Sequence, residues 1–249
     1  MTERIDRASA IMGVLSDTGS ASVADLAQEL GVSEVTIRGD LRKLEQQGKL
    51  VRTHGGARPL GHKTILQRER IRVDEKQRIA AAAAAMLTDD DAVMIEAGTT
   101  AAQIVKHLTG RLGVQVVTNS ALVFAHARAN PALNVILSGG VFRHESESFV
   151  GPIAERTVGE FNARIAFLGT DGFSAERGLT TRFVEGAQVS NIMRDRAEET
   201  WLVADSSKFG QAGFVSFMPL ARITGIITDS GLTDEAAASL SEHTRLRIV

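Results

Sequence analysis

Apolar side chains recur at three- and four-residue intervals from the start of the chain, which is the period of a helix with one buried face. The first stripe consists of Ile5, Ala8, Ile11, Met12 and Leu15. It predicts a helix that ends near Gly19. A shorter stripe predicts a second helix over 23–30, with Ser22 before it and Gly31 after it. The chain is therefore expected to begin with two amphipathic helices.

A third helix and a hairpin are predicted directly after this pair. Ser33 is a natural N-cap for a helix over 34–47, because its hydroxyl can accept a hydrogen bond from a backbone N–H of the first turn. The residues expected to face inward are Val35, Leu41 and Leu44, and Gly48 ends the helix. The stretch 49–58 is β-branched and basic and contains Gly55 and Gly56. It predicts a small hairpin, the wing of a winged helix-turn-helix.

The rest of the chain alternates between strand-like and helical patterns. A helix is expected over about 75–87, where six alanines at 80–85 favour tight helix packing. Seven short apolar runs follow, at 93–95, 114–117, 135–137, 165–168, 201–203, 223–227 and 246–249. This alternation predicts the α/β class, with an open, mostly parallel sheet and helices on both faces.

Two domains are therefore expected. The first is a winged helix-turn-helix domain over 1–58, and the second is an α/β domain over 75–249. Residues 59–74 are polar, follow no clear period and contain Pro59 and Gly61, so they are predicted to form a linker. A length of 249 residues exceeds that of most single domains, and 43% hydrophobic residues are enough for a buried core.

Composition also limits the chemistry and the location. The chain has no cysteine, which excludes disulfides, thiolate metal sites and cysteine nucleophiles. No apolar run approaches the roughly 18 residues that span a bilayer, so a cytoplasmic protein without a membrane partner is expected. No cofactor is expected, and no metal site either, because the six histidines show no ligand spacing.

The charge is distributed unevenly along the chain. The formal charge of the whole chain is −2, but 38–58 holds six Lys or Arg residues against two acids, a net charge of +4. Most charge runs are only a solvated helix face. This one coincides with a two-helix pattern, a glycine turn and a basic hairpin, and cations that neutralise phosphates release condensed counterions. We therefore predict that the third helix enters the major groove of double-stranded DNA.

The motif Ser33-Glu-Val-Thr-Ile-Arg-Gly-Asp-Leu41, followed by Leu44-Glu45, Gly48, Leu50-Val-Arg52 and His54-Gly-Gly-Ala57, resembles the DeoR family of bacterial regulators of sugar metabolism. The resemblance implies DNA contacts from the serine, the threonine and the basic residues of the third helix. The full expected DNA-binding set is Ser33, Thr36, Ile37, Arg38, Arg42, Lys43, Arg52 and His54. Family members commonly carry a second basic residue where this chain has Gly39, which leaves one expected contact in question.

Some of these residues also have a simpler interpretation. Ser33 can be only a helix cap, and His54 can be only a turn residue. Asp40 is acidic beside a polyanion, so it is expected to pair with Arg38 or Arg42 and hold them rather than touch DNA.

Small and hydroxyl residues gather in five loops that follow predicted strands, at 96–101, 118–120, 138–140, 169–172 and 204–208. Ligands of open α/β sheets bind beyond the carboxyl ends of the strands. Gly98-Thr99-Thr100 is the sharpest of these signals, because free N–H groups at the start of a helix, together with two hydroxyls, can face an anion. A helix cap with a flexible turn is the simpler interpretation.

From about residue 75 to the end, the chain resembles the DeoR effector domain, which is similar in fold to ribose-5-phosphate isomerase. The resemblance implies that the Gly-Thr-Thr turn holds a sugar phosphate, that Asp171 borders the sugar, and that Lys208 reaches toward the same pocket. The full expected effector-binding set is Gly98, Thr99, Thr100, Asn119, Gly139, Gly140, Arg143, Asp171, Gly172, Glu185 and Lys208. Arg143 can equally be a surface charge, and Glu185 a solvated helix residue.

The alternative function is that of a sugar-phosphate isomerase, which needs a base, an acid and a cationic group around adjacent carbons. The isomerase pattern has two acids near its Asp-Gly step and then a lysine, whereas this chain has Asp171-Gly-Phe-Ser174 and Gly178-Leu-Thr-Thr181. One acid and the lysine are missing. We therefore expect no catalytic residues and no enzyme activity.

The expected protein is a transcription regulator that represses a carbohydrate catabolic operon and responds to a phosphorylated sugar. It is expected to act as a homo-oligomer, a dimer or a tetramer, because one recognition helix reads too few bases for useful affinity.

Overall fold

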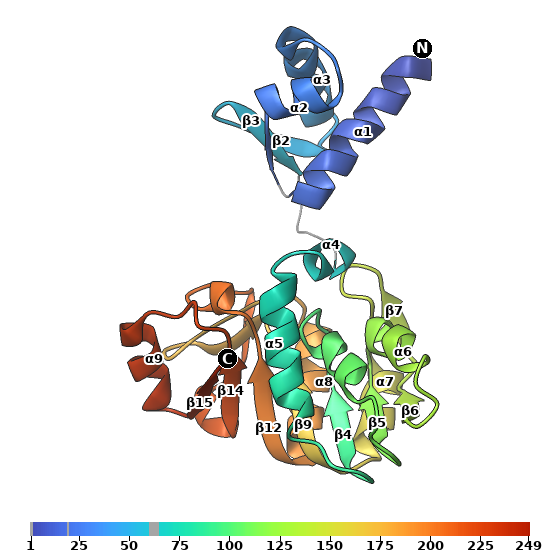
Figure 1. The fold of residues 1–249 in the computed structure, drawn as a ribbon, viewed down its shortest axis with the longest axis vertical. Helices are drawn as coiled ribbons and strands as arrows, with labels where there is room; N and C mark the ends of the chain where they lie inside the picture. Colours follow the sequence, from blue (N-terminus) through green and yellow to red (C-terminus); the bar gives the residue numbers. More distant parts are fainter. Residues whose placement is uncertain (1, 19, 60–64) are drawn as a thin grey trace. The chain divides into compact units, whose positions relative to one another are not determined.

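The chain forms two compact units, Met1–Ile71 and Arg72–Val249. The structure is a computed structural model that describes residues 2–18, 20–59 and 65–249. Figure 1 follows the chain from the first unit, in blue, to the second, in green to red.

The described residues of the first unit contain four helices and a small antiparallel sheet. The elements are α1 (Thr2–Thr18), β1 (Ala21–Ser22), α2 (Val23–Glu29), α3 (Glu34–Gln46), β2 (Leu50–Thr53), β3 (Gly56–Pro59) and α4 (Ile65–Glu69). The three predicted helices and the predicted hairpin are present. Two elements were not predicted. Strand β1 pairs with β3, and α4 lies within the stretch that was expected to be a linker. The core consists of Ile11, Leu15, Val23, Leu26, Ile37, Leu41, Leu44, Leu50 and Ala57.

Two glycines shape the wing for different reasons. Strands β2 and β3 are joined by His54 and Gly55, and Gly55 has φ +90°, which a residue with a side chain rarely adopts. Gly56 has ordinary dihedrals, but a Cβ there would lie 2.2 Å from the carbonyl oxygen of Ala21. Only glycine therefore lets β1 approach β3 closely enough to pair.

The second unit, all of which the structure describes, is built on a parallel seven-stranded sheet in the order β15-β14-β12-β9-β4-β5-β6. Its strands are β4 (Ala92–Ile95), β5 (Gln115–Thr118), β6 (Asn134–Leu137), β9 (Ala163–Leu168), β12 (Ala197–Val203), β14 (Gly225–Thr228) and β15 (Arg245–Ile248). Each of the seven predicted apolar runs forms one of these strands. The expected α/β class with a mostly parallel sheet is therefore confirmed.

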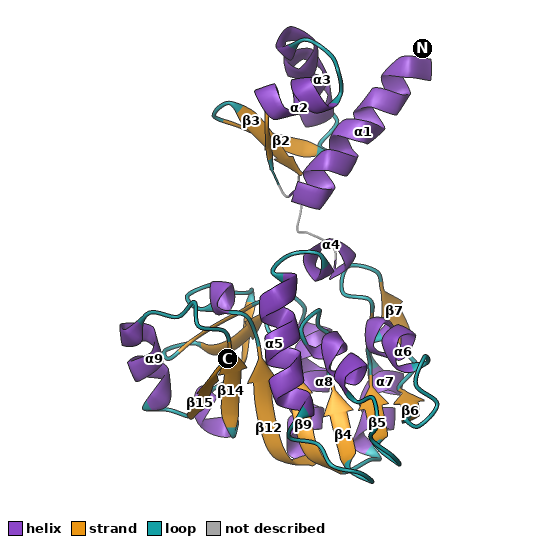
Figure 2. Ribbon diagram, in the orientation of Figure 1, coloured by secondary structure: helices purple, strands orange, loops and turns teal. Residues whose placement is uncertain are grey.

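Helices cover both faces of this sheet. Figure 2 shows α5 (Val73–Ala84), the 3₁₀ helix η1 (Ala101–His107) and α6 (Ala121–Ala127) on one face, and α7 (Pro152–Gly159) and α8 (Val184–Asp195) on the other. Helix α9 (Asp234–Ser241) precedes β15. Four of the six consecutive alanines, at 80 and 82–84, are buried where α5 packs against η1, which agrees with the expected tight helix packing.

Short elements lie in the connections between the strands of the sheet. They are β7 (Val141–Arg143), β8 (Ser148–Val150), β10 (Gly172–Ser174), β11 (Gly178–Thr181), β13 (Val215–Met218) and the 3₁₀ turns η2 (Ser206–Lys208) and η3 (Leu220–Arg222). Strands β7 and β8 form one hairpin, and β10, β11 and β13 form a second antiparallel sheet. None of these strands was predicted, because each is short and lacks a clear period.

A bidentate ion pair ties β9 to the turn before β4. Arg164 donates through Nε to Asp91 Oδ1 at 2.7 Å and through Nη2 to Asp91 Oδ2 at 2.6 Å. The hydrogen bonds from Arg164 lower the pKa of Asp91 from 3.8 to about 2, although partial burial opposes them. A carboxylate held this firmly makes the stability of the unit depend on pH at the acid end.

Candidate DNA-binding surface and effector site

Helix α3 presents most of the expected DNA-binding residues on its exposed side. Ser33 caps the helix, with Oγ accepting from the N–H of Thr36 at 3.2 Å and lying 2.9 Å from Thr36 Oγ1. Arg42 and Lys43 are exposed, and within the described part of the chain their side chains have no ion-pair partner. Ser33 is therefore a cap whose side chain is still exposed, and two cations are available to an anion.

A groove of about 380 Å³ runs between α3 and the hairpin; we call it the helix–wing groove. Its lining is Val23, Arg38, Leu41, Arg42, Glu45, Arg52, Thr53, His54, Gly55 and Gly56. Three arginines and one histidine therefore line a concave surface with a single acid. Such a surface suits a phosphate backbone, since guanidinium groups bind phosphate oxygens bidentately. The side chain of Arg58, and residues 60–64 of the expected linker, lie outside the described residues.

Two of these arginines are already paired with acids of α3. Arg38 Nη2 lies 2.9 Å from Glu34 Oε2, and Arg52 Nε lies 2.8 Å from Glu45 Oε2. Hydrogen bonds from the backbone and then the side chain of Arg52 lower the pKa of Glu45. Both pairs are exposed, so DNA phosphates can compete for the arginines at little cost.

The prediction that Asp40 pairs with Arg38 or Arg42 is wrong. Asp40 accepts a hydrogen bond of 2.6 Å from Nε of Arg7 in α1, not from Arg38 or Arg42. The two residues are 33 positions apart, and only the packing of α1 across α3 brings them together. Asp40 therefore contacts the first helix rather than orienting the arginines that were expected to contact DNA.

The inward face of α3 differs from the prediction at Val35 and Ile37. Ile37, expected at the DNA surface, is completely buried in the core, whereas Val35, expected in the core, is 81% exposed. Leu41 and Leu44 are buried as expected. Ile37, Leu41 and Leu44 follow the helical spacing, and Val35 does not belong to that stripe. Ile37 therefore has no surface to offer DNA.

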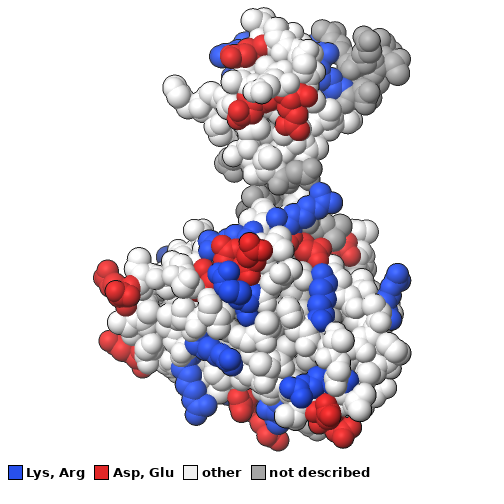
Figure 3. Space-filling model, in the orientation of Figure 1, with Lys and Arg blue, Asp and Glu red and all other residues white. Residues whose placement is uncertain are grey.

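Acidic side chains also lie on the surface of the first unit. Figure 3 shows Asp and Glu side chains gathered on the face of this unit that is turned toward the viewer.

In the second unit, the five expected loops follow five adjacent strands. The strands are β12, β9, β4, β5 and β6, and all run parallel. Their carboxyl ends therefore lie along one edge of the sheet, which brings the loops together. The chain winds outward from β4 through β5 to β6 and then returns to the other side of β4 at β9. The topological switch point, where open α/β sheets bind ligands, thus lies between β4 and β9.

The loops after β4 and β9 contact each other at this point. Glu96, which is 8% exposed, accepts a hydrogen bond at Oε2 from the N–H of Gly169 at 3.2 Å. A Cβ on Gly98 would lie 3.8 Å from the Cα of Gly169. Glu96 was missing from the expected site residues, although its place directly after an apolar strand is the signal that could have found it.

The Gly98-Thr99-Thr100 turn offers unoccupied donors. The N–H groups of Thr99, Thr100 and Ala101 donate no hydrogen bond to any residue that the structure describes, and Thr100 caps η1 without a side-chain hydrogen bond. Helix starts leave such donors open to anions. The helix that follows is 3₁₀ in form rather than a regular α-helix.

Other expected site residues have structural roles. Asn119 is completely buried and links the loops, because Oδ1 accepts from the N–H of Ala97 at 3.1 Å and Nδ2 donates to the carbonyl of Phe149 at 3.3 Å. A Cβ on Gly140 would lie 2.7 Å from the carbonyl oxygen of Val150, whereas Gly139 has open space around it. Asn119 and Gly140 therefore hold the edge in place, and Gly139 remains open to a ligand.

Asp171 contacts the segment between β11 and α8. Its Oδ2 accepts from the N–H of Arg182 at 3.0 Å, and the guanidinium of Arg182 lies 3.8 Å from Oδ1. Gly172 is buried. A Cβ there would lie 2.1 Å from the carbonyl oxygen of Gln211. Arg182 was not among the expected residues, because only the fold brings this cation beside Asp171.

Arg143 and Glu185, each of which had two possible interpretations, form an ion pair. Arg143 Nη2 lies 2.7 Å from Glu185 Oε1, and the guanidinium carbon lies 4.6 Å from the centre of the Phe183 ring. Lys208 ends the η2 turn after β12, and its N–H donates to the carbonyl of Asp205 at 3.0 Å. Arg143 and Glu185 thus neutralise each other, and neither is an isolated surface charge.

Within the described residues, no helix is long and apolar enough to cross a membrane. The same residues contain no group of three or more His, Asp or Glu side chains that could hold a metal ion.

These features define a class of protein, a helix-turn-helix DNA-binding unit joined to an α/β sensor unit. Two family models match the chain: a DeoR-like helix-turn-helix domain over residues 7–61 and a DeoR C terminal sensor domain over residues 71–230. The chain belongs to the DeoR family of transcriptional regulators, which confirms the resemblance in its sequence.

Relatives match along nearly their whole length. The HTH-type transcriptional regulator GlpR of Haloferax volcanii is 35% identical, covering 91% of this chain and 90% of that protein. The lactose phosphotransferase system repressor of Streptococcus mutans is 30% identical, covering 97% and 98%. A structure of ribose 5-phosphate isomerase A from Methanocaldococcus jannaschii aligns with a TM-score of 0.41 at 20% identity, covering 55% of this chain and 54% of that one. A likeness this low carries no conclusion about activity.

Proposed function

We propose that this regulator represses a carbohydrate catabolic operon by binding double-stranded operator DNA, and that a phosphorylated sugar modulates the binding. Residues 1–58 would bind DNA, 75–249 would bind the effector, and 59–74 would join them. The observation that carries the proposal is the arginine-lined helix–wing groove on a chain whose second unit matches a sensor domain. A relative named as a lactose phosphotransferase system repressor supports the direction of control.

The DNA-binding mode follows from which residues are exposed. Recognition helices of this class contact base edges with their N-terminal residues. Ser33, Thr36 and Arg38 lie in the N-terminal half of α3 and are assigned to the major groove. The phosphate contacts are assigned to Arg42, Lys43, Arg52 and His54. Ile37 is left out, because it is buried.

The effector site is proposed at the switch point between β4 and β9. The open N–H groups of the Gly98–Thr100 turn, together with the hydroxyls of Thr99 and Thr100, are assigned to the phosphate, since such donors bind anions without needing a charged side chain. Lys208 is assigned to the same anion, and Asp171 and Gly139 border the sugar. Asn119, Gly140 and Gly172 are assigned positioning roles only.

We propose that this pocket binds without catalysis. Isomerisation requires an acid–base pair beside the sugar carbons. After Asp171 the chain continues into Phe173, which is completely buried and packs edge-on against Phe209 with ring centres 5.8 Å apart. The β10–β11 positions where the isomerase pattern has its second acid and its lysine are occupied by Phe, Ser, Leu and Thr.

A homo-oligomer, dimer or tetramer, is part of the proposal, because two recognition helices read paired half-sites. Sedimentation with and without operator tests it, and a monomer under both conditions would contradict it.

Two matched variants test the two assignments. The promoter fragment is taken from sugar genes that adjoin the regulator's own gene. Arg38→Ala should weaken specific binding by about 1–3 kcal/mol if Arg38 reads a base. Thr99→Ala should keep operator affinity but reduce the thermal stabilisation by sugar monophosphates. If Thr99→Ala lowers operator affinity and leaves the ligand response intact, the pocket is misplaced. Turnover of a pentose or hexose phosphate at ordinary enzyme rates would contradict the non-catalytic pocket.

A further inference from the structure

Arg72 has an unusual backbone for an arginine. It is the first residue of the second unit, directly before α5, and has φ 54° and ψ 47°, in the left-handed region. Side chains with a Cβ rarely adopt this conformation, and glycine or asparagine would take it at lower cost. Such strain persists only where surrounding contacts impose it, and it concentrates at functional and switching positions.

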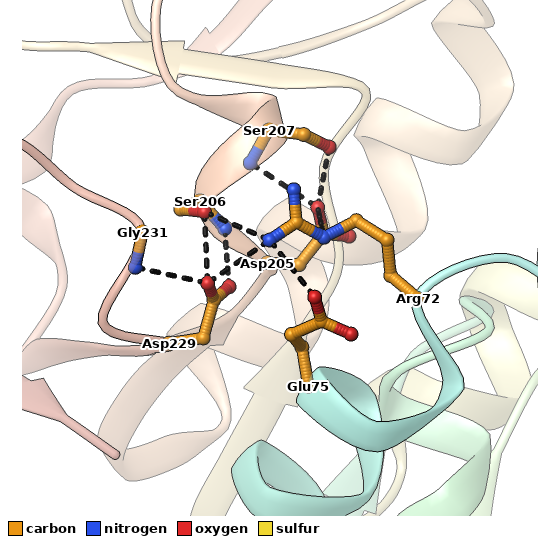
Figure 4. Close-up of polar contacts among 7 residues, drawn as sticks. All are labelled: Arg72, Glu75, Asp205, Ser206, Ser207, Asp229 and Gly231. Carbon is orange, nitrogen blue, oxygen red and sulfur yellow. Dashed lines mark hydrogen bonds and ion pairs between the residues drawn. The ribbon is translucent and has the colours of Figure 1, made fainter.

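The side chain of Arg72 supplies those contacts (Figure 4). Its Nη2 lies 3.1 Å from Asp229 Oδ2, 3.2 Å from Ser206 Oγ and 3.2 Å from Glu75 Oε1, and its Nε lies 3.5 Å from Asp205 Oδ1. We call this group the Arg72 latch. It joins the start of α5 to the residues directly after β12 and β14, which are neighbours in the sheet.

The two aspartates of the latch depend on these contacts. Asp205 and Asp229 are 3% and 2% exposed. Asp229 also accepts hydrogen bonds from the N–H of Ser206 at 2.6 Å and of Gly231 at 3.0 Å. Burial raises the pKa of Asp229, but these hydrogen bonds and the charge of Arg72 outweigh it and leave the pKa lowered. The Asp229 carboxylate is therefore charged, and removing the Arg72 cation beside it leaves buried negative charge without this partner.

The latch holds the turn that carries the proposed effector cation. Asp205 caps the η2 turn through a hydrogen bond from the N–H of Ser207 at 3.2 Å, and Lys208 lies at the end of that turn. Ser206, inside the turn, is held by both Arg72 and Asp229. A shift of Lys208 toward an anion therefore moves groups that Arg72 binds.

We propose that Arg72 is the positioning residue that couples the effector site to the DNA-binding unit, an inference that rests on the proposed function. An anionic sugar at Lys208 shifts the Asp205–Lys208 turn and so changes the contacts that Asp205 and Ser206 make with the Arg72 guanidinium. The left-handed backbone then relaxes, and because the chain passes from the first unit to the second at Ile71 and Arg72, its direction at that junction changes. The latch is thus a two-state element that both ligands can bias.

The test compares operator affinity with and without ligand in Arg72→Gln, Arg72→Lys and a matched control, Arg78→Gln. Arg78 is an exposed arginine of the same helix, for which the described residues provide no ion pair. The probe is whichever of ribose 5-phosphate, glucose 6-phosphate, fructose 6-phosphate or glycerol 3-phosphate raises the wild-type melting temperature most. Fluorescence anisotropy of a labelled promoter fragment gives the affinity ratio.

Wild type and Arg78→Gln should show a ligand-dependent change in affinity of about 5- to 150-fold, the usual range of allosteric coupling. Arg72→Gln should bring the ratio to within about two-fold of unity while operator is still bound without ligand. Arg72→Lys keeps the charge but not the planar fork, so its ratio should be intermediate. It also serves if Arg72→Gln does not fold, since it leaves no buried carboxylate without a cation.

The failures are distinguishable. If wild type binds promoter and responds to ligand, and folded Arg72 variants respond equally, the latch is overturned and the proposed function stands. If wild type shows no response to any of the four probes, the proposed function fails and the inference falls with it. Coupling free energy is the same in both directions. The effect of operator on ligand affinity must therefore also be lost in Arg72→Gln.

Discussion

Gly39 is the position where this chain lacks the second basic residue common in its family, and substitutions there separate helix stability from DNA contact. Gly39 is exposed near the middle of α3, and a Cβ added to it has no other atom within 4 Å. Alanine therefore gains helix propensity without steric cost, about 1 kcal/mol. In a unit the size of Met1–Ile71, that gain corresponds to a rise in melting temperature of roughly 4–8 °C.

Gly39→Arg should give a similar gain in stability and also add a cation to the DNA-facing side of the helix. One more phosphate contact makes the slope of log K against log salt concentration steeper by about 0.9. Thermal melts measure the first effect, and anisotropy titrations over a series of salt concentrations measure the second. Gly13 is a matched control, because it is an exposed glycine of α1 that also has no atom within 4 Å of an added Cβ.

Gly13→Arg should raise the melting temperature without changing the salt dependence of operator binding. If Gly39→Ala fails to stabilise the first unit, the helical environment assigned to residue 39 is wrong. If Gly39→Arg and Gly13→Arg change the salt slope equally, residue 39 does not face the phosphates.

Two further predictions concern stability. The Asp91 carboxylate has a pKa of about 2 in the folded chain against 3.8 as its ordinary value. At 1.36 kcal/mol per pKa unit, the difference contributes about 2 kcal/mol. This stability is present above pH 4 and is lost as the pH falls through 2, so acid unfolding followed by circular dichroism should be flatter in Asp91→Asn. In the first unit, Gly56→Ala forces a Cβ within 2.2 Å of the Ala21 carbonyl oxygen and should cost about 1–3 kcal/mol in urea unfolding, whereas an unchanged midpoint would contradict the β1–β3 pairing.

The large elements of the fold could be predicted because their signals are local. The central strands β4, β9 and β14 are short, mostly apolar runs that are buried along nearly their whole length, and α2 and α3 begin at serine caps. The strands β1, β7, β8, β10, β11 and β13 have two to four residues each, which is too short for a clear period, and β1 and β13 pair with strands far along the chain. Two glycines, Gly56 and Gly172, are explained only by the backbone that crosses them.

The loops of the proposed effector site could be predicted from the sequence, but the contacts between them could not. The loops at the carboxyl edge were expected from the strand pattern, and the order of the strands brings them together. The roles within them depend on contacts between distant residues, such as Glu96 with Gly169 or Arg72 with Asp229. The same applies to Asp40, whose partner Arg7 lies on another helix. In α3, the sequence predicted the helix correctly, but it placed Val35 on the buried face in place of Ile37.

The most direct test of the account is retention of a promoter fragment by the purified full chain, measured over a series of salt concentrations with and without sugar monophosphates. The account predicts retention at low ionic strength, a steep loss of affinity as salt rises, and a shift of the binding curve by at least one sugar phosphate. A chain that retains no promoter fragment at low ionic strength, with or without metabolites, would contradict it.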